Sequence, residues 1–176
     1  GKVPTMPSEV VQVLVGKTMK PEESYIYGLY SRFMGWVDET RTINVRTNAD
    51  QPDQTRNARA LGAEGIGLCR TEHMFFDDER TPLGQGMMLA RDEEGRGAAL
   101  AKLLPMQRGD FEGIFEVMDG FPVTVRTLDA PLHEFLPTSA EDISSVADDL
   151  GVRIESLEER IQTLHESNPM MGHRGG

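Results

Sequence analysis

The hydrophobic positions in the first quarter of the chain follow a helical period. Between residues 22 and 37, apolar side chains recur three or four positions apart, which is the spacing of one helix face. The stripe consists of Ile26, Leu29, Tyr30, Phe33, Met34 and Val37. We expect this face to pack against a core, with Trp36 covering the fold from outside. Residues 1–20 predict a linker that contains one short strand, VVQVLV at residues 10–15.

The next apolar runs are short and alternate with helical segments. Residues 43–48 and 65–69 predict strands, separated by a helix that Asp50 caps, with Pro52 in its first turn and Gly62 just past its end. A strand, a short helix and a strand in such close succession form a βαβ unit, which implies parallel pairing.

The βα alternation continues beyond residue 70. Residues 85–104 predict a helix, although Gly95 and Gly97 weaken it. A second helix with an apolar stripe ends at Gly120, and residues 122–125 predict a third strand. The stripe consists of Phe111, Ile114, Phe115 and Met118. The pattern therefore indicates an α/β fold with a parallel sheet.

The pattern after residue 137 changes to helices alone. Ser139 with Asp142 resembles a capping box, and the helix that it starts runs to Gly151. A second amphipathic helix carries Ile154, Leu157, Ile161 and Leu164. We expect these two helices to form an insertion after the third strand. The terminal NPMMGHRGG then predicts the entry into a fourth strand.

Composition narrows the class of protein. The 176 residues are enough for one domain with a real core, but too few for a complete (β/α)8 barrel, which needs about 250. The net charge of −11 argues against a nucleic acid or an anionic membrane as the main partner. Cys69 is the only cysteine, and no run is apolar enough to span a membrane. These features predict a soluble cytoplasmic protein.

Two predicted strands each end in an arginine, Arg70 in GIGLCRTEHMFF and Arg126 in VTVRTLDAPLHEFLP. The carboxyl ends of parallel strands are where α/β folds place their sites. A guanidinium group matches phosphate or carboxylate oxygens bidentately and stays charged at working pH. The pair therefore predicts an anion pocket. The alternative is that each arginine only forms a salt bridge with one of the many nearby acids.

Three segments, GLCRTEHMFF, RTLDAPLHEFLP and NPMMGHRGG, resemble the phosphoenolpyruvate-utilising enzymes, and the likeness runs from about Pro21 to the last residue. It implies that residues 21–176 form the amino-terminal half of a phosphoenolpyruvate/pyruvate-binding TIM barrel. That half would contain about the first four strands of the (β/α)8 fold and the helical insertion after the third. Residues 1–20 would then link it to a preceding domain.

The resemblance also implies roles for single residues. Arg70 and Arg126 match arginines that hold the phosphate of phosphoenolpyruvate, and Arg174 matches a third active-site arginine. Asp129 would orient an arginine, and Glu72 would do the same for Arg70. His73 and His133 lack a metal-ligand spacing and favour structural hydrogen bonds. Cys69 is expected to be buried and inert. The Mg²⁺ ligands and the acid–base residue of the family are expected outside this chain.

The branch of the family that the segments favour is a phosphotransferase. It interconverts ATP, phosphate and pyruvate with AMP, diphosphate and phosphoenolpyruvate through a phosphohistidine domain, and we expect a homodimer. Phosphoenolpyruvate synthase and the sugar phosphotransferase enzyme I are alternatives within the family. The isolated chain is expected to be inactive. A different class stays open: a catalytically silent interaction module that uses its exposed strand edges.

Overall fold

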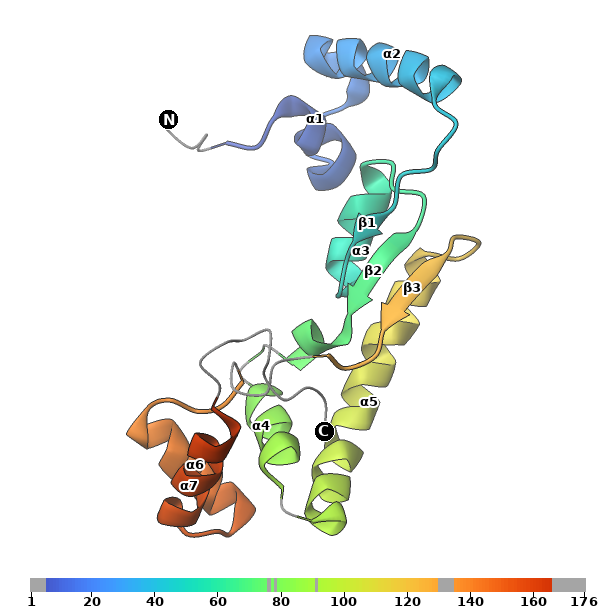
Figure 1. Ribbon diagram of the computed structural model, residues 1–176. Helices are drawn as coiled ribbons and strands as arrows, with labels where there is room; N and C mark the ends of the chain where they lie inside the picture. Colours follow the sequence, from blue (N-terminus) through green and yellow to red (C-terminus); the bar gives the residue numbers. More distant parts are fainter. Residues whose placement is uncertain (1–5, 76, 78, 91, 130–134, 166–176) are drawn as a thin grey trace.

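The computed structural model describes residues 6–75, 77, 79–90, 92–129 and 135–165. A parallel sheet of three strands lies at its centre, with β1 (Thr47–Asn48), β2 (Ile66–Arg70) and β3 (Val123–Arg126) in that spatial order. Helices lie beyond both ends of the strands, which makes the chain elongated (Figure 1). The predicted α/β class and the parallel pairing are confirmed, but β1 is shorter than the predicted strand at residues 43–48.

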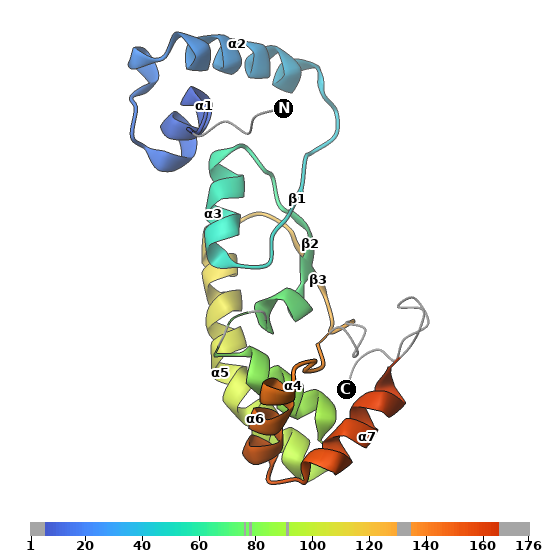
Figure 2. The same cartoon turned by 90° about the vertical axis from the view of Figure 1, so that its left-hand side faces the viewer.

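Two helices, α3 (Pro52–Ala60) and α5 (Glu93–Val117), cover one face of the sheet, as Figure 2 shows. They pack closely against each other, because a Cβ atom on Gly113 of α5 would lie 2.8 Å from Cγ of Pro52. The core between helices and sheet consists of Ala49, Ile66, Cys69, Met74, Ile114 and Met118. Burial of these apolar side chains fixes the sheet on the helices.

The start of α3 differs from the prediction at Asp50. Pro52 is in the first turn and Gly62 follows the helix with a φ of +98°, both as expected. The residue at the N-cap is Gln51, however, and it makes no side-chain cap hydrogen bond. The prediction that Asp50 caps the helix is wrong, because its carboxylate faces β2 and accepts a hydrogen bond there.

The segment between β2 and β3 also differs from the prediction. A 3₁₀ helix, η3 (Thr71–Phe75), follows β2 directly, and α4 (Thr81–Leu89) precedes α5. The predicted boundary between two helices near residue 104 is wrong, because α5 continues through Pro105. A proline inside a helix costs about 3 kcal/mol. The helix persists because Leu103 is buried on one side of Pro105 and Ile114 on the other.

The two helices predicted after the third strand are confirmed as α6 (Ala140–Leu150) and α7 (Ile154–Leu164). The hydroxyl of Ser139 accepts a hydrogen bond from the Asp142 backbone at 3.0 Å, and Gly151 ends α6 with a φ of +63°. A second hydrophobic core joins these helices to α4 and to the start of α5. Its buried residues are Phe75, Met87, Met88, Leu89, Leu103, Phe135, Leu136, Val146, Ala147, Leu157 and Leu164.

The amino-terminal segment is helical. It contains α1 (Glu9–Val11), a π-helical turn η1 (Gln12–Gly16), a 3₁₀ turn η2 (Pro21–Glu23) and α2 (Tyr25–Thr40). The predicted strand at residues 10–15 is therefore wrong. Ser8 caps α1 through the backbone of Val11, and Glu9 accepts a hydrogen bond from the Ser24 hydroxyl at 2.5 Å. These contacts hold the segment against α2 and override its β-branched composition.

The apolar stripe of α2 lies largely at the surface. Ile26, Leu29 and Phe33 are 51%, 47% and 59% exposed, the other three members are half-buried, and α2 contains no buried residue. The helix itself was predicted correctly, but the expectation that its stripe packs against a core is wrong. Helical spacing reports which side chains share a face, whereas tertiary structure decides whether another element covers that face. In the described ranges, Tyr30, Met34 and Val37 line one side of a cavity whose other side includes Leu14 and Val45.

Candidate functional site

Arg70 and Arg126 lie side by side at the carboxyl ends of two neighbouring strands. They are direct register partners in the parallel pairing of β2 with β3. Cys69 is fully buried towards the helices, so the pleat of β2 turns the next side chain, Arg70, to the opposite face. The side chains of Arg70 and Arg126 are 37% and 34% exposed. The fold thus brings the two predicted arginines together on one rim.

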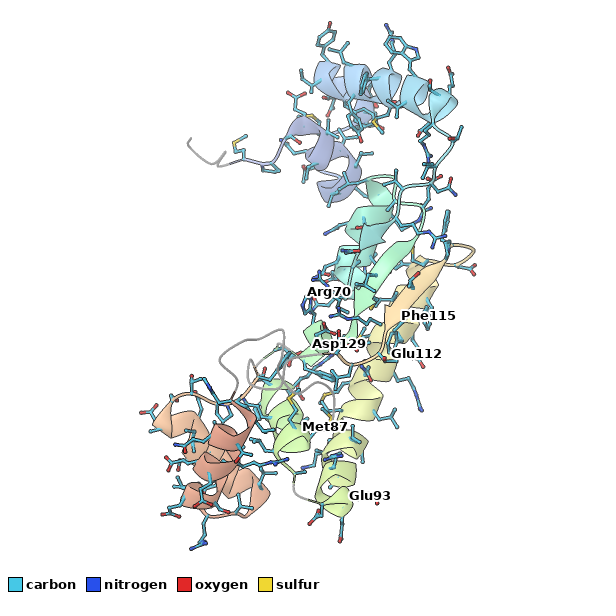
Figure 3. All side chains as sticks on the ribbon, viewed as in Figure 1. Arg70, Met87, Glu93, Glu112, Phe115 and Asp129 are labelled. Carbon is cyan, nitrogen blue, oxygen red and sulfur yellow. The ribbon has the colours of Figure 1, made fainter. Side chains whose placement is uncertain are left out.

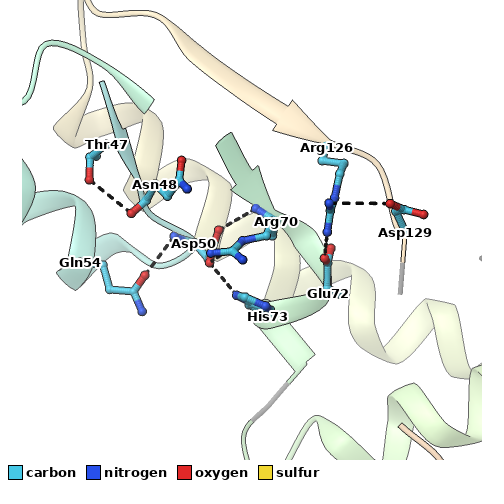
Figure 4. A network of polar contacts seen from close by, with 9 residues as sticks. All are labelled: Thr47, Asn48, Asp50, Gln54, Arg70, Glu72, His73, Arg126 and Asp129. Atoms are coloured by element: carbon cyan, nitrogen blue, oxygen red, sulfur yellow. Dashed lines mark hydrogen bonds and ion pairs between the residues drawn. The ribbon is translucent and has the colours of Figure 1, made fainter. Parts of the chain in front are cut away.

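Arg126 is held by two carboxylates. Its Nη2 atom forms a hydrogen-bonded ion pair with Glu72, and its Nη1 atom lies 3.7 Å from Oδ2 of Asp129 (Figure 4). Glu72 belongs to η3 and is only 5% exposed, whereas Asp129 follows β3 and is largely solvated. The two acids named from the sequence therefore both contact an arginine. Glu72 contacts Arg126, not Arg70 as the sequence suggested.

Arg70 has a looser environment. Its backbone N–H donates to Oδ1 of Asp50 at 2.6 Å, and its Nε atom lies 3.9 Å from Oδ2 of the same carboxylate. The second distance is too long for a hydrogen bond. Within the described part of the chain, the terminal nitrogens of Arg70 form no hydrogen bond or ion pair.

Buried polar atoms without a hydrogen-bond partner cluster around these arginines. In the described residues, they include Nε of Arg70, Oγ1 of Thr71, Oε2 of Glu72 and Nε of Arg126. Most buried polar groups in proteins are paired with protein, ordered water or a ligand. The Nε atoms of Arg96 and Arg160, which are not rim residues, are unpaired in the same way, so unpaired atoms alone do not mark a ligand site. Here the cluster contains two guanidinium groups, which suits an oxyanion such as phosphate.

Asp50 is a site residue that the sequence did not identify. It is 5% exposed and contacts both Arg70 and His73, whose Nδ1 atom lies 2.8 Å from Oδ2. This contact agrees with the structural hydrogen bond expected of His73. A signal was present, because Asp50 closely follows the end of a predicted strand and parallel strands end at one rim. Because Asp50 was interpreted as a helix cap, it was not considered as a site residue.

Two predicted residues cannot be placed. Arg174 and His133 lie outside the described residues, and so does the NPMMGHRGG segment that predicts a fourth strand.

Cys69 lies beneath the two arginines and is fully buried. Removal from water raises the pKa of its thiol to about 11, and the negative charges of Asp50, Glu72 and Asp110 add to this effect. Only the thiolate is a nucleophile, so a thiol with this pKa is almost inert at neutral pH. The expectation that Cys69 is buried is confirmed, and the raised pKa agrees with an unreactive thiol.

The Cys69 thiol should show its raised pKa in two measurements. Because the thiolate fraction falls tenfold per pH unit below the pKa, we expect alkylation near pH 7.5 to be about 100-fold slower than for an exposed cysteine. The unfolded thiol ionises from its ordinary value of 9.0, so the free energy of unfolding should fall between pH 9 and the folded pKa of about 11. A Cys69→Ala variant should lack this last part of the pH dependence. Fast alkylation of the native chain would contradict the burial.

Other features of the described residues lie away from the arginines. A cavity of about 750 Å³ lies between α2 and the turn that precedes β2, at the amino end of the sheet. In the described part of the chain, no group of three histidine, cysteine or acidic side chains is placed to hold a metal ion. Among the helices with described coordinates, none is long and apolar enough to cross a membrane.

The sequence comparisons identify the family of the chain. The family described as PEP-utilising enzyme, PEP-binding domain, matches residues 27–176. The match covers most of the chain, so the chain belongs to the phosphoenolpyruvate-utilising enzymes, and it matches their phosphoenolpyruvate-binding domain.

Individual relatives show which enzymes of this family the chain is similar to. The chain is 52% identical over 177 residues to the pyruvate, phosphate dikinase of Rhizobium meliloti (strain 1021), covering 99% of this chain and 19% of that protein. It is 47% identical over 157 residues to the pyruvate, phosphate dikinase of Clostridium symbiosum, covering 89% of this chain and 18% of the relative. The enzyme of the same name from Giardia intestinalis is 51% identical over 142 residues, which are 81% of this chain and 16% of the relative. The chain thus spans about a fifth of the length of the relatives it matches.

Proposed function

We propose that this chain supplies the phosphate-binding part of the phosphoenolpyruvate/pyruvate site of a pyruvate, phosphate dikinase. Residues 21–176 would form the amino-terminal half of a (β/α)8 barrel, and residues 1–20 the link to a preceding phosphohistidine domain. The observation that carries the proposal is the register pairing of Arg70 with Arg126 at the carboxyl ends of parallel strands. That edge is the usual site of catalysis in barrels of this type.

Arg70 and Arg126 would contact opposite sides of the phosphate. Arg126 is fixed by Glu72 and Asp129, and it would present a rigid donor to one side of the anion. Arg70 would close the other side with its terminal nitrogens. Phosphoryl transfer depends on positioning and on stabilising the charge of the moving oxygens, so a pair of fixed guanidinium groups suits it. Arg174 would add a third arginine.

The charge balance of the rim limits its affinity for an anion. Asp50, Glu72 and Asp129 carry three negative charges around the two positive arginines, so the net charge of these five groups is −1. A phosphate would compete with the carboxylates for the guanidinium donors, which limits its affinity. We infer that the remaining affinity, together with Mg²⁺ and the acid–base residue, comes from the part of the dikinase outside this chain.

A titration of the chain with phosphoenolpyruvate tests the proposal. We expect weak, millimolar binding, because half of a site provides only about 4 kcal/mol of binding free energy. Nuclear magnetic resonance measures such affinities, and the shift changes should concentrate at Arg70 and Arg126. Inorganic phosphate should compete. A chain without shift changes, or with changes confined to α2, would contradict the proposal.

The second candidate is an interaction module, which the exposed apolar surface favours. An apolar groove of about 460 Å³ lies along α5 and β3, lined by Leu104, Phe111, Phe115 and Val125. Figure 3 labels Phe115 on α5. Strand β3 is also an edge strand in the described sheet, and open edges recruit partners. A homodimer, as expected for the dikinase, would use such surfaces. Sedimentation of the titrated samples separates the two ideas, because a silent module would associate without binding phosphoenolpyruvate.

A further inference from the structure

Asp50 connects the ends of two strands through a buried carboxylate. It follows β1 closely, and its Oδ1 atom accepts the backbone N–H of Arg70 on β2 at 2.6 Å. Its Oδ2 atom lies 2.8 Å from Nδ1 of His73 and 3.9 Å from Nε of Arg70. The backbone N–H of Asp50 donates to Oε1 of Gln54 at 3.0 Å, which fixes the residue on α3 (Figure 4).

A carboxylate at this position is not explained by stability alone. Asp50 is 5% exposed, and removing a charged group from water is costly even when it is paired. Parallel strands pair through their backbones without such a charge. The presence of a buried carboxylate here is therefore better explained by the group that it holds in position. The Asp50 carboxylate contacts the backbone N–H of Arg70 and lies near Nε of its guanidinium group.

We propose that Asp50 is the positioning residue for Arg70, and this inference rests on the proposed phosphate site. A free arginine side chain populates many rotamers, and part of this freedom is lost when the group binds an anion. Asp50 restrains the base of the Arg70 side chain before the ligand arrives, so less of this freedom is lost on binding. The terminal nitrogens of Arg70 stay directed at the phosphate.

A substitution of Asp50 changes the affinity for phosphoenolpyruvate in opposite directions under the two explanations, positioning and simple electrostatics. Replacing Asp50 by asparagine removes a negative charge near the anion, so electrostatics alone predicts tighter binding of phosphoenolpyruvate. Loss of positioning predicts weaker binding. We expect the Asp50→Asn chain to bind about tenfold more weakly, which corresponds to about 1.4 kcal/mol.

The experiment is a double-mutant cycle with Asp50→Asn and Arg70→Ala, measured by the same titration of the full chain with phosphoenolpyruvate. We expect Asp50→Asn to have no further effect once Arg70 is alanine, because Asp50 acts through Arg70. The matched control is Asp53→Asn, an exposed acid on α3 whose ion pair is with Arg56, and it should bind like the parent chain.

Each outcome of the cycle is decisive. Unchanged or tighter binding by Asp50→Asn, or an equal loss in the Arg70→Ala background, overturns the role of Asp50. Unchanged binding by Arg70→Ala instead overturns the phosphate site itself, so the two failures are distinguishable. If Asp50→Asn does not fold, Gln54→Ala replaces it, because that change frees the Asp50 backbone and keeps its carboxylate. It should weaken binding about threefold with Arg70 present, and unchanged binding would overturn the inference.

Discussion

Replacing Arg126 by alanine is expected to lower kcat/KM for phosphoenolpyruvate by about 100- to 1,000-fold, the loss typical of removing one preorganised donor to a transition state. The measurement uses the full-length Rhizobium meliloti pyruvate, phosphate dikinase in which this chain replaces the matching segment. Arg126 is suited to this role because Glu72 and Asp129 fix its guanidinium group before substrate binds.

Arg126→Lys should recover only part of the activity. Lysine keeps the positive charge but lacks the planar fork that can contact a carboxylate and a phosphate together. The matched control is Arg56→Ala, because Arg56 is an exposed arginine of α3 whose ion pair is with Asp53. A chimera with Arg126→Ala that stays within about twofold of its parent would remove Arg126 from the phosphate site, since such a change is well under 1 kcal/mol.

Replacing Gly65 by alanine is expected to destabilise the chain by about 3–5 kcal/mol, the sum of backbone strain and overpacking. Gly65 has a φ of +146°, which disfavours side chains, and an added Cβ atom would lie 2.7 Å from the backbone oxygen of Pro122. That oxygen accepts the N–H of Ile66 at 2.9 Å, so the clash falls on the first hydrogen bond between β2 and β3. Urea denaturation followed by circular dichroism measures the loss.

Gly62→Ala is the control that separates strain from steric clash. Gly62 also has a positive φ, +98°, but no atom lies within 4 Å of its added Cβ. We expect a loss of about 1 kcal/mol, because only the backbone strain remains. Equal effects at Gly62 and Gly65 would show that the close approach to Pro122 does not limit the pairing of the strands.

Much of the fold was predictable because local signals and tertiary structure agree. Helix α6 has a capping serine at its start and a glycine at its end, and its predicted bounds are confirmed. The parallel pairing of β2 with β3 followed from the alternation of strands and helices. The errors concern Pro105 and the strand predicted at residues 10–15, where packing overrides local propensity.

Part of the site was predictable for a similar reason. Arg70 and Arg126 each follow a short apolar run, and parallel strands that end together bring such residues to one rim. The carboxylates that contact these arginines were harder to predict from the sequence. Glu72 is closer in sequence to Arg70 but contacts Arg126, and Asp50 reaches Arg70 from 20 residues away. Sequence distance does not determine these pairs, because they cross from one strand to the next.

The sequence by itself determined the alternation of strands and helices and the positions of the two arginines. It did so because the spacing of apolar residues and the capping residues act over a few neighbours. Only the tertiary structure decided which carboxylate holds which arginine, and that the apolar face of α2 lies at the surface. Both depend on contacts between residues that are distant in the sequence. Such contacts decide which side chains are buried and which charged groups form ion pairs.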